Sequence, residues 1–253
     1  MTRRPVLREW DAWTYDRVAD PMTRWGSAVL DRLPLAGDET VLDAGCGSGR
    51  VTELLAALLP HGRVIALDGS TAMIEAARDR LARFGDRIDY VVADLGLPLP
   101  LTEPVDAILS TATFHWVPDH DSLFANLGAV LHPGGWLVAQ CGGVGNIASI
   151  QEVLAAIGDG WLGGVHFESP MATVRRLDAA GFVDIECWLT YEPTRFEPGE
   201  PFETYLRTVV LGADVERLPA PERDGFVRMV AERLGEPVID YVRLNIVARR
   251  SSQ

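Results

Sequence analysis

The chain has 253 residues, of which 47% are hydrophobic, and this predicts a globular protein with one large domain or one domain carrying a lid. A formal net charge of -13 disfavours DNA or RNA as a partner, because the field of the whole molecule would repel a polyanion. All 23 basic residues are arginine, which excludes Schiff-base chemistry and a P-loop lysine.

Signals for a membrane or for secretion are absent from the sequence. No apolar stretch reaches the roughly 18 residues that a membrane span needs, and the first residues lack the apolar core of a signal peptide. We therefore expect no membrane partner and a cytoplasmic location. Cys46, Cys141 and Cys187 are far apart and form no CxxC pair, which argues against a disulfide framework or a zinc site. We interpret them as core thiols.

Strand-like and helix-like segments alternate along the first part of the chain. A helical region covers about residues 8–33. Strand patterns follow at 40–44, 63–67, 88–93, 105–110 and 136–140, with helices between them at 50–59, 71–84 and 122–131. This alternation predicts an α/β fold, a doubly wound and mostly parallel sheet with helices on both faces. A sharp turn over 132–135 is expected just before the fifth strand.

Beyond Gly145 the pattern changes. A short helix at 151–158 precedes a helix that should begin after Ser169 as its N-cap, with Pro170 in its first position, and end at Gly181. Two more strands are expected at 183–189 and 242–248, separated by a helical insertion at about 190–240 that we interpret as a lid. We expect a single domain, 1–253, built from an N-terminal helical lid (1–35), a binding core (36–145) and a second half of the sheet (146–253).

The run VLDAGCGSG, residues 41–49, is the most informative segment. An apolar strand ends near Asp43 and opens into a turn with three alternating glycines, which can adopt positive φ and bring bare backbone against a ligand. A dinucleotide-binding loop has its third glycine where this chain has Arg50, so NAD is disfavoured. The alternative without a ligand is a tight turn between strand and helix. Asp43 suits a ligand with ammonium and sulfonium charges, which points to S-adenosylmethionine.

Two further acids end the neighbouring strands. Asp68 ends the second strand, where a doubly wound sheet places the ribose of a nucleoside, and its carboxylate can accept from both ribose hydroxyls. Alternatively, Asp68 is an acid that stabilises the N-terminus of the next helix through the helix dipole. Asp94 ends the third strand, where it can accept from an adenine amino group while Leu95 covers a ring face. The three acids predict one site along one edge of the sheet.

With the motifs VLDAGCGSG, VIALDGS, VVADL and LHPGGWLV, the chain resembles class I S-adenosylmethionine-dependent methyltransferases over about residues 10–250. Within that class, EWDAWTYDRVADP, TATFHWVPDH and RLNIVARR are similar to the trans-aconitate 2-methyltransferase type. The resemblance implies a seven-stranded sheet whose last strand is antiparallel, and an N-terminal segment that closes over the cofactor. The expected cofactor-binding residues are Tyr15, Asp43, Gly45, Gly47, Asp68, Gly69, Met73, Asp94, Leu95 and Thr111.

The segment of residues 110–120 follows the fourth strand, where the methyl acceptor binds in this fold. His115 and Trp116 are candidates for the acceptor side. His115 can deprotonate or orient a hydroxyl, or it can be a packing histidine; a carboxylate acceptor, as in the aconitate enzyme, is already ionised and needs no base. Arg24 is a candidate for binding an anionic acceptor. We expect no metal site, because His115 and His120 do not share a helix face and have no third partner at a known spacing.

The sequence thus predicts a methyltransferase that moves a methyl group from S-adenosyl-L-methionine to a small-molecule acceptor, at a carboxylate or hydroxyl oxygen. Two alternatives stay open. One is a protein that binds S-adenosylmethionine without catalysis. The other is an NAD-dependent oxidoreductase, which Arg50 and the absence of a Tyr-x-x-x-Lys pair disfavour.

Overall fold

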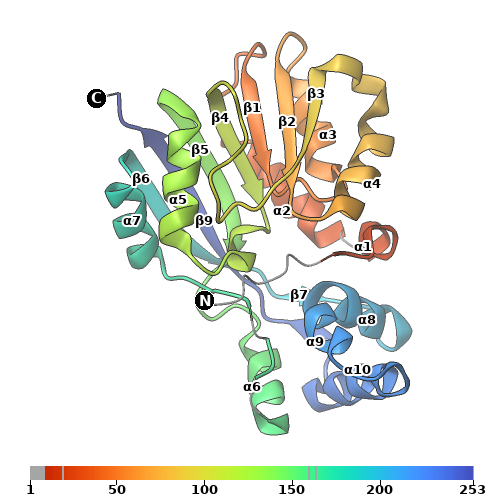
Figure 1. The fold of residues 1–253 in the computed structure, drawn as a ribbon. Helices are drawn as coiled ribbons and strands as arrows, with labels where there is room; N and C mark the ends of the chain where they lie inside the picture. The colour runs from red at the N-terminus through yellow and green to blue at the C-terminus, as the bar shows by residue number, and fades with distance from the viewer. Residues whose placement is uncertain (1–8, 19, 159, 163, 253) are drawn as a thin grey trace, which may run out of the picture.

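The computed structural model describes residues 9–18, 20–158, 160–162 and 164–252. Its centre is a seven-stranded sheet in the order β3-β2-β1-β4-β5-β9-β6 (Figure 1). The pairs among β1 to β5 are parallel, whereas β9 runs antiparallel to both β5 and β6, so the predicted sheet is confirmed. The strands are β1 Thr40–Ala44, β2 Arg63–Asp68, β3 Ile88–Val92, β4 Val105–Thr111, β5 Leu131–Gly142, β6 Phe182–Tyr191 and β9 Val242–Arg250.

The turn expected before the fifth strand lies inside β5 instead. β5 pairs with β4 at Leu131 and again from Trp136 onwards, so residues 132–135 bulge out between two paired stretches. Gly134 has a φ of +80°, and a Cβ on Gly135 would lie 2.7 Å from the Asp106 carbonyl oxygen of β4. The glycines therefore indicate the change of direction correctly. The predicted strand boundary is wrong, because β5 pairs with β4 on both sides of these glycines.

Helices cover both faces of the sheet, because neighbouring residues of a strand point to opposite sides. In β1, Val41 packs in one core with α2, α3 and α4, whereas Leu42 packs in another core with α5 and α7. α7 begins as predicted, since the Ser169 hydroxyl accepts from the Ala172 N–H and Pro170 is the first helical residue. The predicted helix over 71–84 ends early and continues as a 3-10 helix. These helices are α2 Asp20–Leu30, α3 Arg50–Leu58, α4 Thr71–Leu81, the 3-10 helix η1 Ala82–Arg87, α5 His120–Ala129 and α7 Pro170–Ala179.

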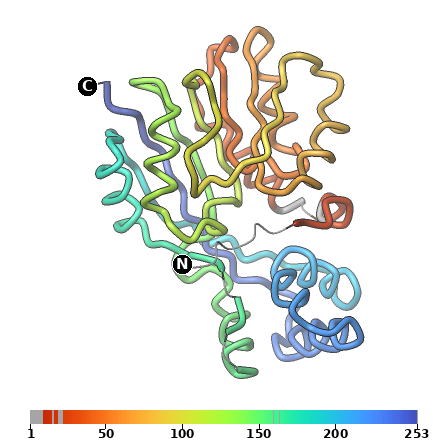
Figure 2. The backbone as a smooth tube through the Cα atoms, in the orientation of Figure 1, coloured from red at the N-terminus to blue at the C-terminus, as the bar shows by residue number. Residues whose placement is uncertain are grey.

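A second, mostly helical layer lies below the carboxyl ends of the parallel strands (Figures 1 and 2). It has a core of its own, in which Trp25 of α2 packs with Ile150, Tyr205 and Phe226. The helical pattern expected for 190–240 is present, together with a ladder of β7 and β8 that no sequence pattern indicated, because each strand has only two residues. The elements of this layer are α6 Ala148–Ile157, β7 Thr194–Arg195, α8 Glu200–Tyr205, the π-helix η3 Leu206–Val210, α9 Gly212–Glu216, α10 Ala220–Leu234 and β8 Val238–Ile239.

The N-terminal region contains two helices, α1 (Ala12–Val18) and α2. Asp16 ties α1 to the core: its Oδ1 accepts from the Ser48 hydroxyl at 2.8 Å, its Oδ2 accepts from Arg80 at 2.6 Å, and its carbonyl oxygen accepts from Arg50. α1 is thereby attached to the glycine turn, to α3 and to α4. That this segment acts as a lid stays a prediction.

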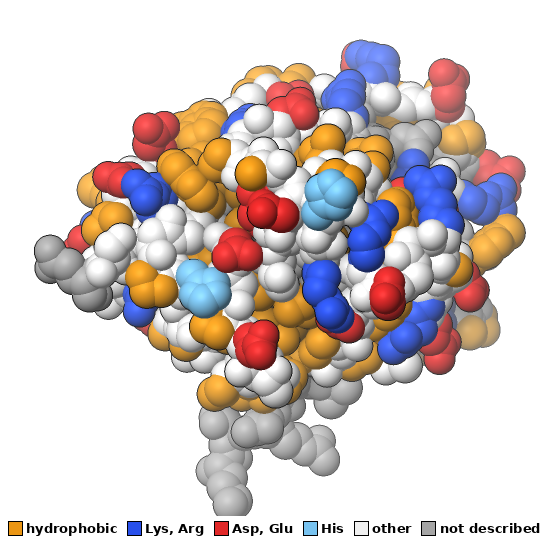
Figure 3. All heavy atoms as spheres, turned by 90° about the horizontal axis from the view of Figure 1, so that it is seen from above, with side chains coloured by type: hydrophobic (Ala, Val, Ile, Leu, Met, Phe, Trp, Pro, Cys, Tyr) orange, Lys and Arg blue, Asp and Glu red, His pale blue; other side chains and the backbone are white. Residues whose placement is uncertain are grey.

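Charged side chains of both signs share the face of the molecule at the amino ends of the parallel strands (Figure 3). Figure 3 looks onto the amino ends of the parallel strands, where acidic and basic side chains are interspersed rather than gathered by sign.

No helix within the described ranges is long and apolar enough to cross a membrane. Cys46 and Cys141 are buried, Cys187 is half-buried, and all three are free thiols.

Candidate active site

The glycine turn after β1 is held by the end of β2. The N–H groups of Gly45 and Cys46 both donate to the Leu67 carbonyl oxygen, at 2.7 and 2.9 Å. Gly45 and Gly47 have φ values of +89° and +54°. A Cβ on Gly45 would lie 2.1 Å from Thr113 Oγ1, whereas a Cβ on Gly47 would meet nothing within 4 Å. The first glycine is therefore required by packing, and only the second faces open space.

The third glycine serves the helices. Gly49 has a φ of +84° and is the N-cap of α3. A Cβ there would lie 3.2 Å from Leu81 and 3.3 Å from Ala77, both on α4. Gly49 thus lets α3 and α4 approach each other, which is the role that the glycine five positions after the first has in a dinucleotide-binding loop. The turn therefore keeps close helix packing although Arg50 occupies that position.

Asp43 lies behind the turn rather than at its surface. The side chain is 1% exposed, and its Oδ2 accepts from the Thr52 hydroxyl at 2.7 Å. Its Oδ1 is buried and has no hydrogen-bond partner among the described residues. Burial raises the pKa of this carboxyl to about 7, and the nearby Asp68 adds to the rise. Near neutral pH, a positive charge in the adjacent turn would favour the ionised form of Asp43.

Asp68 ends β2 and supports the turn. Its Oδ2 accepts from the Gly47 N–H at 2.9 Å and its Oδ1 from the Ser70 N–H at 2.9 Å. Burial raises the pKa of this carboxyl, and the two backbone hydrogen bonds oppose the rise. Glu9 reaches the same place, because its carboxylate accepts from the Ser70 hydroxyl at 2.7 Å and from the Thr71 N–H at 3.2 Å, at the start of α4. No pattern in the sequence indicated this Glu9 contact.

The other predicted cofactor residues lie along the same edge of the sheet. Asp94 follows β3, and its Oδ1 accepts from the Gly96 N–H at 2.8 Å. Leu95 beside it is buried. Met73 is buried in the first turn of α4, and its N–H donates to the Ser70 hydroxyl at 3.3 Å.

Three predicted residues complete this set. Gly69 connects Asp68 to Ser70 and is half-buried. Thr111 is the last residue of β4 and lines the same cavity as Gly45 and Gly47. Tyr15 belongs to α1, and its side chain is outside the described residues.

Two cavities meet beside the glycine turn. The smaller, of about 370 Å³, is lined by residues of the turn and of α2 and by Thr111, and we name it the cofactor-side cavity. The larger, of about 510 Å³, lies toward the helical layer, and we name it the acceptor-side cavity. Met22 and Ala112 line both. Ala112 has a φ of +55°, an unusual backbone conformation for a residue with a Cβ. The backbone therefore turns sharply at Ala112, which lies where the two cavities meet.

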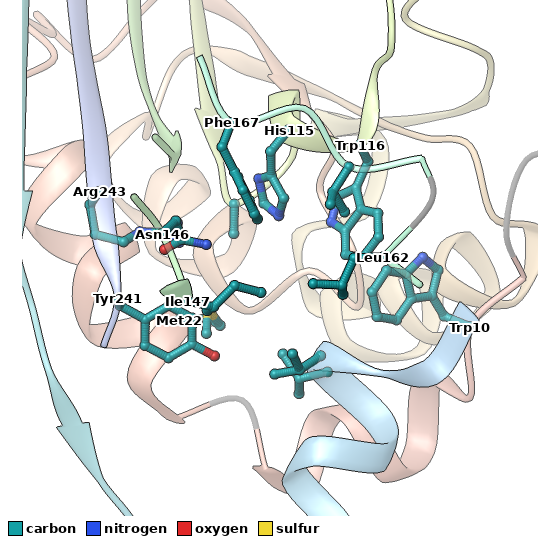
Figure 4. Close-up of a pocket in the computed structure, with 14 residues that line it drawn as sticks. Trp10, Met22, His115, Trp116, Asn146, Ile147, Leu162, Phe167, Tyr241 and Arg243 are labelled. Carbon is teal, nitrogen blue, oxygen red and sulfur yellow. The ribbon is translucent and has the colours of Figure 1, made fainter. Parts of the chain in front are cut away.

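The acceptor-side cavity contains the predicted His115 and Trp116, both from the 3-10 helix η2 (Phe114–Trp116) (Figure 4). The imidazole of His115 is buried, and its Nδ1 accepts from the Gly142 N–H at 3.3 Å. Because a backbone N–H can only donate, the ring carries its proton on Nε2. Burial, with the positive charge of Arg243 nearby, holds the pKa of His115 well below its usual range, so the ring is neutral at physiological pH.

Arg243 supplies a buried cation that the sequence did not single out. Its side chain lines the acceptor-side cavity and is 2% exposed. The guanidinium carbon lies 4.8 Å from the ring centroid of Trp25, and Nε donates to Gln140 Oε1 at 3.4 Å. The Gln140 amide is oriented in turn by Asn245, whose Oδ1 accepts from Gln140 Nε2 at 2.8 Å. Arg243 is therefore held in place by a buried chain of polar side chains.

Asn146 is a further polar residue of this cavity that the sequence did not indicate. It is buried, and its Oδ1 accepts from the Val242 N–H at 3.0 Å, which leaves Nδ2 as the group that can donate into the cavity beside Arg243 (Figure 4). Arg24, by contrast, is exposed on α2 and does not line either cavity. Arg243 replaces it as our candidate for binding an anionic acceptor.

The cofactor-side features fit a positively charged sulfur nucleoside. A buried carboxylate oxygen without a donor, on Asp43, lies behind a turn that leaves open space at Gly47. Two further acids, Asp68 and Asp94, end the neighbouring strands with oxygens that can accept additional hydrogen bonds. Within the described part of the chain, no His, Cys, Asp and Glu side chains form a group of three or more that could hold a metal ion.

Comparisons with known proteins agree with this chemistry. A family model described as "Methyltransferase domain" matches residues 41–135. A trans-aconitate 2-methyltransferase of Paracidovorax citrulli is 30% identical over 97% of this chain and 100% of its own length. Another, of Delftia acidovorans, is 31% identical over 96% of this chain and 99% of its own length.

Solved structures show the same fold with different acceptors. Phosphoethanolamine N-methyltransferase 2 of Haemonchus contortus, in complex with S-adenosyl-L-methionine, has a TM-score of 0.63 at 21% identity and covers 96% of this chain and 57% of that one. Geranyl diphosphate C-methyltransferase of Streptomyces coelicolor, in complex with S-adenosyl-L-homocysteine, has a TM-score of 0.57 at 19% identity. The match covers 90% of this chain and 76% of that one. The chain belongs to the S-adenosylmethionine-dependent methyltransferases, in the family that contains the trans-aconitate 2-methyltransferases.

Proposed function

We propose that this methyltransferase transfers its methyl group to a carboxylate oxygen of a small molecule and so forms a methyl ester. The observation that carries the proposal is the set of polar groups in the acceptor-side cavity. Arg243 donates and is positively charged, His115 donates from Nε2, and Asn146 donates from Nδ2. No carboxylate lies among the described residues that line this cavity. A site built from donors favours an acceptor that is already an anion.

The state of His115 separates a carboxylate from a hydroxyl acceptor. A hydroxyl loses a proton on methylation, so a base within reach accelerates its reaction. His115 is neutral, but its basic nitrogen, Nδ1, already accepts from the Gly142 N–H. Only the N–H at Nε2 is left to face an acceptor. His115 therefore suits the orientation of a carboxylate and not the removal of a proton.

S-adenosylmethionine supplies an electrophilic methyl group on a cationic sulfur. When a carboxylate takes that methyl, one negative and one positive group become two neutral groups, and no proton has to move. Surroundings with few water molecules favour such a loss of charge, and most of the side chains that line the acceptor-side cavity are apolar. Arg243 and His115 would fix the carboxylate against these walls, and such placement lowers a barrier by up to about 7 to 11 kcal/mol.

We further propose roles for the residues on the cofactor side. Asp68 would bind the ribose hydroxyls, since each of its oxygens accepts one backbone N–H and keeps a lone pair. Asp94 and Leu95 would contact the adenine, and Met73 would pack against it. The open space at Gly47 would receive the part of the cofactor that carries the sulfur.

The test is an assay with S-adenosylmethionine labelled in its methyl group, against matched panels of carboxylic acids, phenols and amines. We expect label in products of the acids only, and release of that label as methanol in alkali. At saturating cofactor, whose positive charge favours the ionised form of Asp43, kcat/KM for an acid should be flat between pH 6 and 9, because the acid is ionised and His115 is neutral throughout. Labelled phenols or amines without labelled acids, or a rate that climbs tenfold per pH unit, would refute the proposal.

A further inference from the structure

The acceptor-side cavity has one charged end and one apolar end. Arg243, Asn146 and Tyr241 lie together on one side in Figure 4, whereas Trp10, Trp116 and Leu162 line the other. Among the described lining residues, Arg243 is the one with a formal charge, since His115 is neutral. The remaining members are apolar, namely Met22, Ala112, Ile147, Val165, Phe167, Val209 and Val210.

We infer, on the basis of the carboxylate methylation proposed above, that the acceptor is a monocarboxylic acid with an apolar body, and not a di- or tricarboxylate. The relatives are named for trans-aconitate, a tricarboxylate. If one of its carboxylates pairs with Arg243 and takes the methyl group, two more must lie in the cavity. A buried carboxylate without a cation or a full set of donors is strongly destabilised. The apolar end offers neither.

The apolar end is held in place by a specific contact. Leu162 has a φ of +54°, a backbone conformation that is unfavourable for a residue with a Cβ. Its N–H donates to both carboxylate oxygens of Asp214, at 3.0 and 3.2 Å, and Asp214 is only 2% exposed. A buried acid thus fixes the backbone of Leu162 so that its side chain projects into the cavity (Figure 4). We assign Leu162 as a residue that selects the body of the acceptor.

Aromatic rings line one side of this end of the cavity. Trp10 packs edge-on against Trp116 with ring centroids 5.4 Å apart, and Trp116 lies 5.1 Å from the ring of His115. An apolar body would therefore lie against indole rings and Leu162 while its carboxylate reaches the donors. The net charge of -13 acts in the same direction, because it repels a trianion more than a monoanion.

The test compares acids of equal length that differ in one carboxylate, such as octanoate and octanedioate, together with trans-aconitate. We expect kcat/KM for octanoate to exceed that for octanedioate and for trans-aconitate at least a hundredfold. With S-adenosylhomocysteine bound, octanoate should raise the melting temperature and the two other acids should not. A preference for octanedioate or trans-aconitate would overturn this inference and leave ester formation standing. A protein that binds S-adenosylhomocysteine but transfers no methyl group from S-adenosylmethionine to any acid, in this assay or in the broader panel, would instead refute ester formation itself.

Variants of the apolar end make the test specific. Leu162→Arg should shift the ratio of kcat/KM values toward octanedioate at least tenfold, because it adds a second cation opposite Arg243, whereas the matched control Leu162→Met should leave the ratio unchanged. Val209→Lys adds a cation from a different element and guards against misfolding of the first variant. An unchanged ratio in both charged variants, with wild-type melting temperatures, would show that the apolar end does not select the acceptor.

Discussion

Gly45 and Gly47 belong to one motif, but alanine at each should have a different effect. Both have positive φ, so both substitutions carry a backbone cost of about 1 to 3 kcal/mol. At Gly45 the new methyl would also lie 2.1 Å from Thr113 Oγ1, and such overpacking costs about 1 to 3 kcal/mol more. At Gly47 nothing lies within 4 Å. Since 1 kcal/mol corresponds to about 2 to 4 °C in a domain of this size, Gly45→Ala should melt roughly 2 to 12 °C below Gly47→Ala.

Thermal unfolding and calorimetry with S-adenosylhomocysteine measure the two effects separately. Gly47→Ala should keep more stability but bind this ligand at least tenfold more weakly, because its methyl enters the cofactor-side cavity. Thr113→Ala in the Gly45→Ala background should restore part of the lost melting temperature, since it removes the two nearest atoms. Equal melting temperatures for the two single variants, or no recovery in the double variant, would refute the assignment of Gly45 to packing.

Three further predictions concern buried polar groups. The folded-state pKa of Asp43 is raised from 3.8 to about 7, so the folded state holds this proton more tightly than the unfolded state, and stability falls as pH rises from about 4 to 7. Asp43→Asn lacks this titration, and its melting temperature relative to the wild type should rise between pH 5 and pH 8, by the equivalent of about 2 to 3 kcal/mol; a constant difference would contradict the raised pKa. Asp68→Ala should weaken S-adenosylhomocysteine binding at least tenfold and also lower the melting temperature, because two backbone N–H groups lose a charged acceptor; unchanged affinity would overturn the ribose assignment. Gln140→Leu should raise the KM for the acid acceptor about tenfold, with kcat and S-adenosylhomocysteine affinity nearly unchanged, because it releases Arg243 Nε; a loss of kcat alone would argue against this positioning role.

The sheet and the glycine turn could be predicted because their signals are local. β1 has the predicted bounds, and the acids at 43, 68 and 94 lie at or just beyond the carboxyl ends of β1, β2 and β3, which a parallel sheet brings to one edge. What the local pattern could not show is which side of the turn each group faces. Asp43 is buried because Thr52 of α3 folds over it, and Gly45 is needed because Thr113 approaches from the end of β4.

The acceptor side was harder to predict, because its residues come from separate parts of the chain. Arg243 had a usable signal: it shares a strand face with Asn245, between the apolar residues Val242, Leu244 and Ile246, so two polar groups point into the interior. Leu162 had none, since a glycine-rich loop reveals neither its positive φ nor its contact with Asp214. The position of the proton on His115 depends on the Gly142 N–H of β5, a partner that only the folded chain brings near.

The attachment of α1 through Asp16 has a consequence for how fast the enzyme can turn over. One half-exposed carboxylate, whose side chain is 32% accessible, joins the N-terminal helix to the same turn that should receive the cofactor. Ion pairs of this exposure are individually weak and become weaker with added salt. Exchange of spent cofactor for fresh cofactor should therefore speed up with ionic strength, while the chemical step, which takes place between buried groups, stays insensitive to it.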